Sequence, residues 1–571
     1  MEAQELRTAR RSPLIGVFIV CIAALALTAC MPGGRSITRS QGANAPKNIV
    51  LIVFEDMSPR IGAFGDHVAA TPVLDAFARQ AVRYPNTFTT SGVCAPSRSA
   101  LITGVHQQTL GTQHMRTKSP VPGMKGGGPI EYEAVPPPEI KAFPELLRRA
   151  GYYTSNNGKT DYQFGDPFTV WDANAPDADW SGRAPGQPFF AMFNIMETHE
   201  SYIWPEDRES ANPLLNAVTL RNRRDLAGKQ QVTDPASVEV PPYLPDTPVV
   251  RADIARHYDN IAFAERQVQR ILDRLAAEGL LDDTLVIVTT DHGDGFPRMK
   301  RTVYDSGIRV PMMVRFPDGR RAGEIEERLV SFVDLAPTIL DAARVTVPDW
   351  MQGRNFLTAM PRNYVFAAAD RHDEVPGRSK AVRDARFKYV RNYLPDLAVL
   401  RPLAFRDALP TMQEFWRLAR AGNLPPAARQ LLEPRGAEEL YDTVADPHEI
   451  RNLAADPAHA KTLGRLRSAM DEWIARTGDL SAVPEADMVA RMWPGLVQPA
   501  TAAPEISVSG GRVIIASGTP GASIAYTLGG IPPETGRVYT GPFAAAPGTV
   551  VSARAIRYGF APSEVRSFEV P

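Results

Sequence analysis

Two long apolar segments constrain the fold of this chain more than any other feature of its sequence. Residues 48–54 (NIVLIVF) and 284–290 (TLVIVTT) are continuous runs rich in β-branched side chains. A strand with one wet face alternates polar and apolar residues, whereas a continuous run indicates a strand buried on both faces, as in a parallel sheet. The runs 188–194 and 311–316 are predicted to be further strands of the same sheet.

Helical patterns lie between these strands. Apolar residues recur at helical spacing over residues 261–275, and helices are also predicted over 71–82, 142–150 and 329–343. Strands that alternate with helices predict an α/β fold, in which a mostly parallel central sheet is flanked by helices. We assign residues 48–365 to this domain.

The pattern changes in the second half of the chain. Residues 380–391 alternate as in a β-hairpin, 438–442 resemble a short strand, and 461–477 form an amphipathic helical pattern. Residues 366–480 are therefore predicted to form a smaller α+β subdomain. Residues 481–504 are rich in Ala and Pro and are predicted to be a linker.

The last segment, residues 505–571, contains short β-like stretches separated by Gly and Pro turns, which predicts a small β-sandwich. The sequence around Tyr526 and Tyr539 resembles the fibronectin-like C-terminal modules of chitobiase-type enzymes. Aromatic side chains can stack on sugars but are more often core residues in small sandwiches. We favour a spacer or accessory role over sugar binding.

The N-terminus carries the features of an export signal. A basic start and an apolar run end in Leu27-Thr-Ala-Cys30, which resembles the lipoprotein box of bacteria. The resemblance implies a signal peptide over residues 1–29, lipidation of Cys30 and a tether over 30–47. The alternatives are a plain signal peptide or an uncleaved anchor. We expect an exported protein, lipid-anchored in the bacterial cell envelope, in the periplasm or on the outer surface.

Cysteine usage singles out one residue of the mature chain. Cys21 and Cys30 belong to the N-terminal segment, so Cys94 is the one internal thiol and has no partner for an internal disulfide. It is a candidate for special chemistry, with a buried bystander cysteine as the alternative. The formal net charge of -1 gives no indication of a nucleic-acid partner.

Acidic and imidazole side chains follow three of the predicted strands. Glu55 and Asp56 come after the strand 48–54, and His199 lies just beyond the strand 188–194. Asp291 and His292 follow the strand 284–290. Ligands of parallel α/β sheets bind beyond the carboxyl ends of the strands. These side chains are therefore expected to converge on one rim of the sheet.

The segment Cys94-Ala-Pro-Ser-Arg98 is predicted to be a loop that enters a short helix. A helix N-terminus favours negative charge, and Arg98 lies one turn later on the same face as Cys94. This arrangement favours a site for an anion beside a polarised nucleophile.

Together with Thr103-Gly104, this segment resembles the signature of the type I sulfatases of the alkaline-phosphatase superfamily, and the resemblance spans residues 48 to about 475. It implies an alkaline-phosphatase-like fold. It also implies that a formylglycine-generating maturation enzyme oxidises Cys94 to formylglycine. One hydroxyl of the hydrated aldehyde attacks sulfur, and the second lets the sulfated residue release sulfate and regenerate the aldehyde.

The resemblance further implies one divalent cation, most simply Ca²⁺ with Mg²⁺ as the alternative, because carboxylate-rich sites suit hard cations. Its implied ligands are Glu55, Asp56, Asp291 and His292, together with residue 94. Glu55 stands where the family more commonly has Asp, so the sequence departs from the family pattern at this ligand.

Basic residues are implied around the sulfate group. Lys159 ends a segment that resembles the family's Gly-Lys run, and Asp161 stands where a histidine is common. Asp161 is expected to contact a substrate hydroxyl or amine, or to position Lys159. The resemblance implies that His199 contacts sulfate or protonates the leaving group. Lys300, with Arg301 as its alternative, matches the family lysine near the bridging oxygen.

Two further histidines are candidate substrate contacts, with packed or loop positions as the alternative: His114 and His372. The run Asn157-Gly-Lys-Thr-Asp-Tyr162 resembles the heparan N-sulfatase-like branch. The expected function is hydrolysis of sulfate esters or sulfamates of a sulfated carbohydrate. The alternatives are a phosphodiesterase or phosphonate hydrolase of the same superfamily, and a catalytically inactive, lipid-anchored glycan-binding protein.

Overall fold

The structure is a computed structural model that describes residues 47–119, 127–205 and 213–571. The predicted signal peptide, Cys21, Cys30 and all of the predicted tether except Lys47 lie outside the described residues. Within the described ranges, no helix combines the length and the apolar character needed to cross a lipid bilayer.

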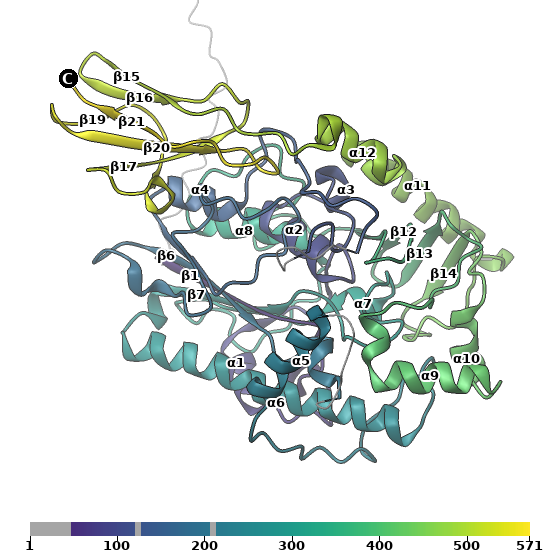
Figure 1. Cartoon of the computed structure of the whole chain (residues 1–571). Helices are drawn as coiled ribbons and strands as arrows, with labels where there is room; N and C mark the ends of the chain where they lie inside the picture. Colours follow the sequence, from purple (N-terminus) through teal and green to yellow (C-terminus); the bar gives the residue numbers. More distant parts are fainter. Residues whose placement is uncertain (1–46, 120–126, 206–212) are drawn as a thin grey trace, which may run out of the picture. The chain divides into compact units, whose positions relative to one another are not determined.

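A seven-stranded sheet forms the centre of the molecule, with the strand order β2-β9-β7-β1-β6-β4-β5. Figure 1 labels its neighbouring central strands β1, β6 and β7. Its strands are β1 Asn48–Phe54, β2 Val82–Arg83, β4 Tyr153–Asn156, β5 Ala173–Asn174, β6 Phe189–Ile195, β7 Thr284–Thr290 and β9 Met312–Arg315. β1 pairs in parallel with both β6 and β7, while β9 pairs antiparallel with β7 and with the edge strand β2. The prediction of a mostly parallel sheet, with β1 and β7 buried on both faces, is confirmed.

Helices cover both faces of this sheet (Figure 1). On one side lie α2 Cys94–Thr103, α4 Phe143–Arg149 and α8 Leu335–Ala342, and on the other lie α1 Pro72–Gln80 and α6 Pro248–Ala277. Successive side chains of β1 point to opposite faces. Ile49 and Leu51 therefore join the core under the first group, and Val50 and Ile52 the core under the second.

Two predicted helices are shorter in the structure. The first residues of the helix expected over 329–343 instead form the strand β10 Val330–Ser331, and α8 begins only after Asp334. The Asp334 carboxylate accepts a hydrogen bond of 3.0 Å from the Ser331 N–H. The helix expected over 71–82 ends at Gln80, because Val82 pairs with Val314 in the sheet. Sheet pairing and turn chemistry outweigh helix propensity at both ends.

A second, antiparallel sheet follows in the order β11-β12-β13-β14. Its strands are β11 Val365–Ala369, β12 Ser379–Arg383, β13 Phe387–Asn392 and β14 Glu438–Asp442. Helix α11 Ala460–Thr477 packs on it, and Trp473 of α11 stacks on Phe366 with ring centroids 4.8 Å apart. The predicted hairpin, strand and helix are all present.

The remaining elements connect these layers. They are β3 Thr87–Phe88 and β8 Arg309–Val310 with the helices α3 Gln107–Leu110, α5 Pro213–Asp225, α7 Asp305–Ile308, α9 Pro410–Arg420, α10 Pro426–Arg429 and α12 Glu485–Met492. Helix α12 corrects the prediction of a plain linker over 481–504. Its Met488 and Val489 are buried in a cluster with Tyr132, so this segment is packed against the domain assigned to residues 48–365.

The C-terminal module contains two antiparallel sheets, β15-β16-β19 and β18-β17-β20-β21. The strands are β15 Glu505–Ser509, β16 Arg512–Ala516, β17 Ser523–Leu528, β18 Arg537–Val538, β19 Phe543–Ala544, β20 Val550–Ile556 and β21 Arg566–Glu569. Ile515 from one sheet and Val551 from the other share one small core. The predicted β-sandwich is confirmed.

Candidate active site

Three parallel strands deliver polar side chains to the same rim of the central sheet. Glu55 and Asp56 follow β1, Asp291 and His292 follow β7, and His199 lies four residues beyond β6. The backbone turns abruptly at Asp56, which has a φ of 43°. Its N–H donates a hydrogen bond of 3.1 Å to a carboxylate oxygen of Asp291, and this bond ties the ends of β1 and β7 together.

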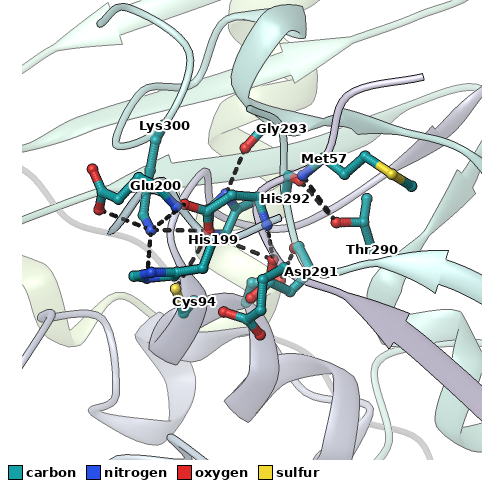
Figure 2. Close-up of polar contacts among 12 residues, drawn as sticks. Met57, Cys94, His199, Glu200, Thr290, Asp291, His292, Gly293 and Lys300 are labelled. Carbon is teal, nitrogen blue, oxygen red and sulfur yellow. Dashed lines mark hydrogen bonds and ion pairs between the residues drawn. The ribbon is translucent and has the colours of Figure 1, made fainter. Parts of the chain in front are cut away.

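Cys94 is the first residue of α2 and faces this rim (Figure 2). Its Sγ atom lies 3.3 Å from Nε2 of His292. Burial raises the pKa of the Cys94 thiol well above its ordinary value, although Lys300 and Lys159 act in the opposite direction. The thiolate is the nucleophilic form of cysteine, so an unmodified Cys94 is poorly suited to attack a substrate at neutral pH.

Arg98 is completely buried beneath Cys94 rather than exposed to a substrate. Its Nε donates to Asp291 at 3.1 Å and its Nη1 to Asn194 at 2.7 Å, while Nη2 pairs with Glu55. All three nitrogens are occupied by protein partners. Arg98 therefore lies between the Glu55 and Asp291 carboxylates, and its predicted part in catalysis stays a prediction.

The carboxylates of this rim form a cluster suited to a metal ion. Ligand atoms lie within 4.8 Å of one another in two overlapping groups, which are Glu55, Asp56, Cys94 and His199, and Asp56, Cys94, Asp291 and His292. The two groups together offer three buried carboxylates and two imidazoles, and the carboxylates match the preference of a hard divalent cation for oxygen ligands. Burial raises the pKa of Asp56 even though Lys300 lies beside it, so further positive charge would stabilise the cluster. The donor set therefore fits a divalent cation.

Lys300 contacts both the carboxylate cluster and His199 (Figure 2). Its Nζ lies 2.9 and 2.7 Å from the two carboxylate oxygens of Asp56, 3.0 Å from Glu200 and 3.3 Å from Nε2 of His199. Burial alone would raise the pKa of Glu200, but Arg301 and Lys300 lower it to about 2. The Glu200 carboxylate is thus a permanent anion that holds both cations in place.

Sequence reasoning did not identify Glu200, although its position next to His199 was an available signal. Arg301, the predicted alternative to Lys300, donates two hydrogen bonds of 3.0 and 2.7 Å to Glu200. It does not line the cavity that opens at Cys94. The structure therefore places Lys300, not Arg301, next to His199 and the carboxylate cluster.

His199 is half-buried and lines that cavity. Burial, reinforced by the charge of Lys300, lowers the pKa of His199 well below its ordinary value. The imidazole is therefore neutral at neutral pH. It can take part in hydrogen bonds to a ligand, but it is not a standing positive charge for an anion.

Lys159 approaches the cluster from the loop after β4. Its Nζ lies 2.7 Å from a carboxylate oxygen of Glu55 and 3.2 Å from one of Asp161. Burial would raise the pKa of Asp161, but the Lys159 ammonium outweighs that effect and holds it below its ordinary value. The Asp161 side chain is 38% exposed, so it can hydrogen-bond Lys159 and a ligand together.

A cavity of about 400 Å³ opens at Cys94 and is lined by both signs of charge. Its basic side chains are Arg116, Lys118, Lys159 and Arg221, and its acidic ones are Glu133, Asp161 and Asp166. Arg221 comes from α5 and Phe405 from a loop far along the chain. These residues belong to no recognisable local motif, and sequence reasoning missed them.

The structure does not bring His114 or His372 to the lining of this cavity. Burial lowers the pKa of His114 to about 4, and its Nδ1 accepts a 3.3 Å hydrogen bond from the Arg371 N–H. The backbone of His372 pairs with Val375. Both are packed residues in this structure, which is the alternative that the sequence left open, and their contact with substrate stays a prediction.

Comparison with known proteins agrees with this geometry. The sulfatase family profile matches residues 47–345, and the chitobiase/beta-hexosaminidase C-terminal domain profile matches residues 503–567. An ulvan-active sulfatase of Formosa agariphila is 40% identical over 540 residues, which cover 90% of each chain. Human N-sulphoglucosamine sulphohydrolase is 29% identical and covers 76% of this chain and 91% of its own.

Solved structures show the same fold. A 2-O GAG sulfatase superposes with a TM-score of 0.53 at 21% identity, over 76% of this chain and 93% of its own. At this identity the likeness concerns the fold alone, and it agrees with the alkaline-phosphatase-like arrangement of the central sheet and its helices.

Proposed function

Because this chain belongs to the sulfatase family and is a sulfatase, we propose that it hydrolyses sulfate esters or sulfamates of an anionic glycan, using a formylglycine formed from Cys94. The position of Cys94 carries this proposal. It is the first residue of a helix, it borders a 400 Å³ cavity, and it lies beside a cluster of buried carboxylates and cations.

The raised pKa of the Cys94 thiol explains why the cysteine itself is a poor nucleophile at neutral pH. Oxidation to formylglycine supplies a hydrated aldehyde, with one hydroxyl to attack sulfur and a second to permit release of sulfate. Glu55, Asp56, Asp291 and His292 would hold the divalent cation, for which we propose Ca²⁺. Such an ion lowers the pKa of a neighbouring hydroxyl and screens the charge of sulfate.

The remaining side chains provide the electrostatic environment for sulfate transfer. Lys159 and Lys300 place two ammonium groups at the carboxylate cluster, where they stabilise the negative charge that develops on sulfate oxygens. His199, which contacts Lys300 and lines the cavity, provides a neutral hydrogen-bonding group for the leaving oxygen or nitrogen. Arg98 pairs with both Glu55 and Asp291 and so holds the two carboxylates in place.

The cavity lining supports a polyanionic sugar as substrate. Arg116, Lys118 and Arg221 can pair with a carboxylate or a second sulfate near the scissile group. Asp161 and Asp166 can accept hydrogen bonds from sugar hydroxyls. One relative is named for activity on ulvan and another for N-sulphoglucosamine. We therefore propose a sulfated polysaccharide, with ulvan fragments as the first substrates to test.

A side-by-side assay tests this function. Protein matured in a host with a formylglycine-generating enzyme is incubated with ulvan oligosaccharides, N-sulfated glucosamine, and phosphate mono- and diesters, and released sulfate and phosphate are measured. The expected result is sulfate release from one of the glycans and little phosphate. A clear preference for phosphate esters would establish the phosphohydrolase alternative instead.

The inactive glycan-binding alternative predicts a different outcome. It requires a Cys94 thiol that stays unmodified in the native host and binding of sulfated glycans without turnover. Peptide mass spectrometry across residue 94 detects the modification, and Cys94→Ala serves as the inactive control. A fully retained thiol together with no released sulfate would overturn the proposed enzyme.

We also propose that the protein is exported and lipid-anchored through Cys30 in the bacterial cell envelope. The lipoprotein-like sequence at residues 27–30 supports this proposal. Fractionation of the native host with a Cys30→Ala control is the test. Recovery of both forms in the same soluble fraction would contradict the anchor.

A further inference from the structure

The C-terminal module reaches the wall of the active-site cavity through one turn, residues 557–559. Tyr558 stacks on Phe164 with ring centroids 5.0 Å apart and an interplanar angle of 14°. Phe164 in turn stacks on Tyr162 at 5.5 Å and 26°. Tyr162 lines the cavity at Cys94, so a continuous aromatic stack runs from the module to the substrate site.

Tyr558 belongs to the core of the catalytic domain rather than to that of the module. It is completely buried and packs in the large apolar cluster that includes Phe143 and Phe190, whereas the module has a separate core around Val551. Its hydroxyl donates a hydrogen bond of 2.9 Å to Glu145 and accepts one of 3.2 Å from the Ala142 N–H. The hydroxyl is therefore held by two hydrogen bonds, and the ring by its stack on Phe164.

The wall segment that receives this stack, residues 160–166, has an unusual backbone. Asp161 and Gln163 have φ values of 55° and 63°, in the left-handed region that non-glycine residues rarely adopt. Such residues persist only where their surroundings hold them. The Gln163 carbonyl accepts a 2.7 Å hydrogen bond from Ala134, and the Phe164 carbonyl accepts one of 3.1 Å from Gly559. The module thus supplies one of the bonds that hold this segment.

A second link joins the turn to the acidic side of the cavity. The amide of Gln498 donates to Glu133 at 3.0 Å and to the Gly559 carbonyl at 3.2 Å. The turn also approaches the catalytic domain closely, because a Cβ atom at Gly559 would lie 2.2 Å from the Ala134 carbonyl oxygen. Only glycine permits this approach at its φ of +81°.

Tyr526 and Tyr539, the aromatic residues of the module that were candidates for stacking on sugars, pack within the module itself. Tyr526 stacks on Phe543 at 4.4 Å and 19°, and Tyr539 packs edge-on against both rings. These contacts favour a structural role for the module over a carbohydrate-binding face. The buried Tyr558 is the aromatic residue that connects it to the substrate site.

We propose that the C-terminal module is a structural part of the active site, in which Tyr558 is a positioning residue that holds Asp161 and Tyr162 in place for the sugar. This inference rests on the proposed glycan sulfatase function. It assigns the module to the recognition of the sugar around the scissile sulfate, through the geometry of the wall segment and not through direct binding.

The test uses full-length, matured enzyme with the variants Tyr558→Ala, Tyr558→Phe and, as a matched control, Phe543→Ala. Phe543→Ala removes an aromatic ring from the module without touching the wall segment. We expect Tyr558→Ala to raise KM for the glycan about tenfold, the factor that about 1.4 kcal/mol of binding represents, with kcat changed less than about threefold. Tyr558→Phe keeps the stack and should restore most of the affinity, and Phe543→Ala should leave KM unchanged.

Hydrogen exchange gives a readout that does not depend on turnover. Amides of residues 160–166 should exchange faster in Tyr558→Ala than in the wild type or in Phe543→Ala, while those of α2 should not change. If Tyr558→Ala fails to fold, Gly559→Ala disturbs the same contact and takes its place. An unchanged KM with unchanged exchange would overturn the inference, as would an equal rise in KM for Phe543→Ala. If no glycan releases sulfate, the function fails while the exchange result still decides the role of Tyr558.

Discussion

The Sγ atom of Cys94 lies 3.3 Å from Nε2 of His292, although 198 positions separate the two residues in the chain. The contact exists because α2 begins where β7 ends, at the carboxyl rim of the central sheet. It places the one internal cysteine against a cluster of carboxylates and ammonium groups. Substitution of these residues is predicted to have distinct effects.

Replacement of Cys94 should abolish turnover. Cys94→Ala removes the proposed precursor of formylglycine, and Cys94→Ser should fail as well when an oxygen-dependent enzyme performs the maturation. Sulfate release, measured by ion chromatography on glycan fragments, should fall by at least about a thousandfold for both variants. Circular dichroism should show that both remain folded, because the site is small compared with the core. Residual activity in Cys94→Ala within tenfold of the wild type would exclude residue 94 as the source of the nucleophile.

Loss of a carboxylate should remove metal and activity together. Asp291→Asn deletes a charge from the cluster and also a partner of Arg98, whose ion pair with Asp291 is 3.1 Å long. Metal content by mass spectrometry and sulfate release should both fall at least about tenfold. Asp282→Asn is the control, because the Asp282 side chain is 90% exposed and distant from the rim. Full activity in a metal-free Asp291→Asn protein would contradict the proposed site.

Lys159→Met should reduce kcat/KM by about a hundredfold or more, since it removes a preorganised ammonium group from the sulfate site. Lys47→Met is the matched control, because the Lys47 side chain is 72% exposed and pairs with Asp283 at the surface. Steady-state kinetics on one glycan substrate distinguish the two variants. If Lys159→Met retained nearly full activity, Lys159 would not contact sulfate.

Arg221→Gln should weaken binding of polyanionic substrates more than it slows their turnover. Arg221 lines the cavity from α5, outside the carboxylate cluster, so its charge acts on the sugar and not on the reacting sulfur. KM should rise about tenfold at low salt, and the difference from the wild type should shrink at high ionic strength because exposed charges are screened. A fall in kcat with no change in KM would place Arg221 in the chemical step instead.

The contact between the module and the catalytic domain should depend on pH through Glu145. Burial alone would raise the pKa of Glu145, but Arg149 and Lys141 outweigh it and lower the pKa from 4.5 to about 2. A carboxyl group whose pKa is lower in the folded than in the unfolded protein stabilises the folded state at pH values above the unfolded-state pKa. This stabilisation is lost as the pH falls towards the folded-state pKa. The contribution is about 3 kcal/mol at most for a completely buried group.

Urea unfolding of the wild type and Glu145→Gln measures this effect. The free energy of unfolding of the variant should be lower than that of the wild type at about pH 6. The difference between the two should narrow as the pH falls below about 4. Glu485, whose pKa is also lowered, pairs with Arg371 instead of with the module, so Glu485→Gln is a control for acid effects outside this contact. A gap that stays constant with pH would show that the Glu145 charge does not stabilise the fold.

Much of the fold could be predicted from local pattern. The runs that became β1 and β7 are apolar on both faces, so they could only be central strands under helices. The hairpin, strand and helix of the second half were also recognisable, because amphipathic spacing is a local property. Helix ends were less predictable, since Val82 left its helix for a pairing with Val314 that lies far away in the sequence.

Strand ends and the motif around Cys94 predicted the candidate residues of the site, and their meeting at one rim follows from a parallel sheet. Their individual roles did not follow, because a role depends on which partner a side chain finds. Arg98 carries the same charge whether it faces an anion or, as here, lies buried between Glu55 and Asp291. In the same way, Lys300 could be distinguished from Arg301 only by its contact with His199.

The cavity and the role of the module lay beyond any local pattern. Arg221, Phe405 and Tyr558 reach the site or its wall from separate parts of the chain, and their neighbouring residues carry no motif that predicts it. Spacing in sequence specifies strands, helices and the residue types available for chemistry, because these depend on short-range backbone geometry. The walls of a binding site depend on contacts between distant segments, which form only when the hydrophobic core has brought those segments together.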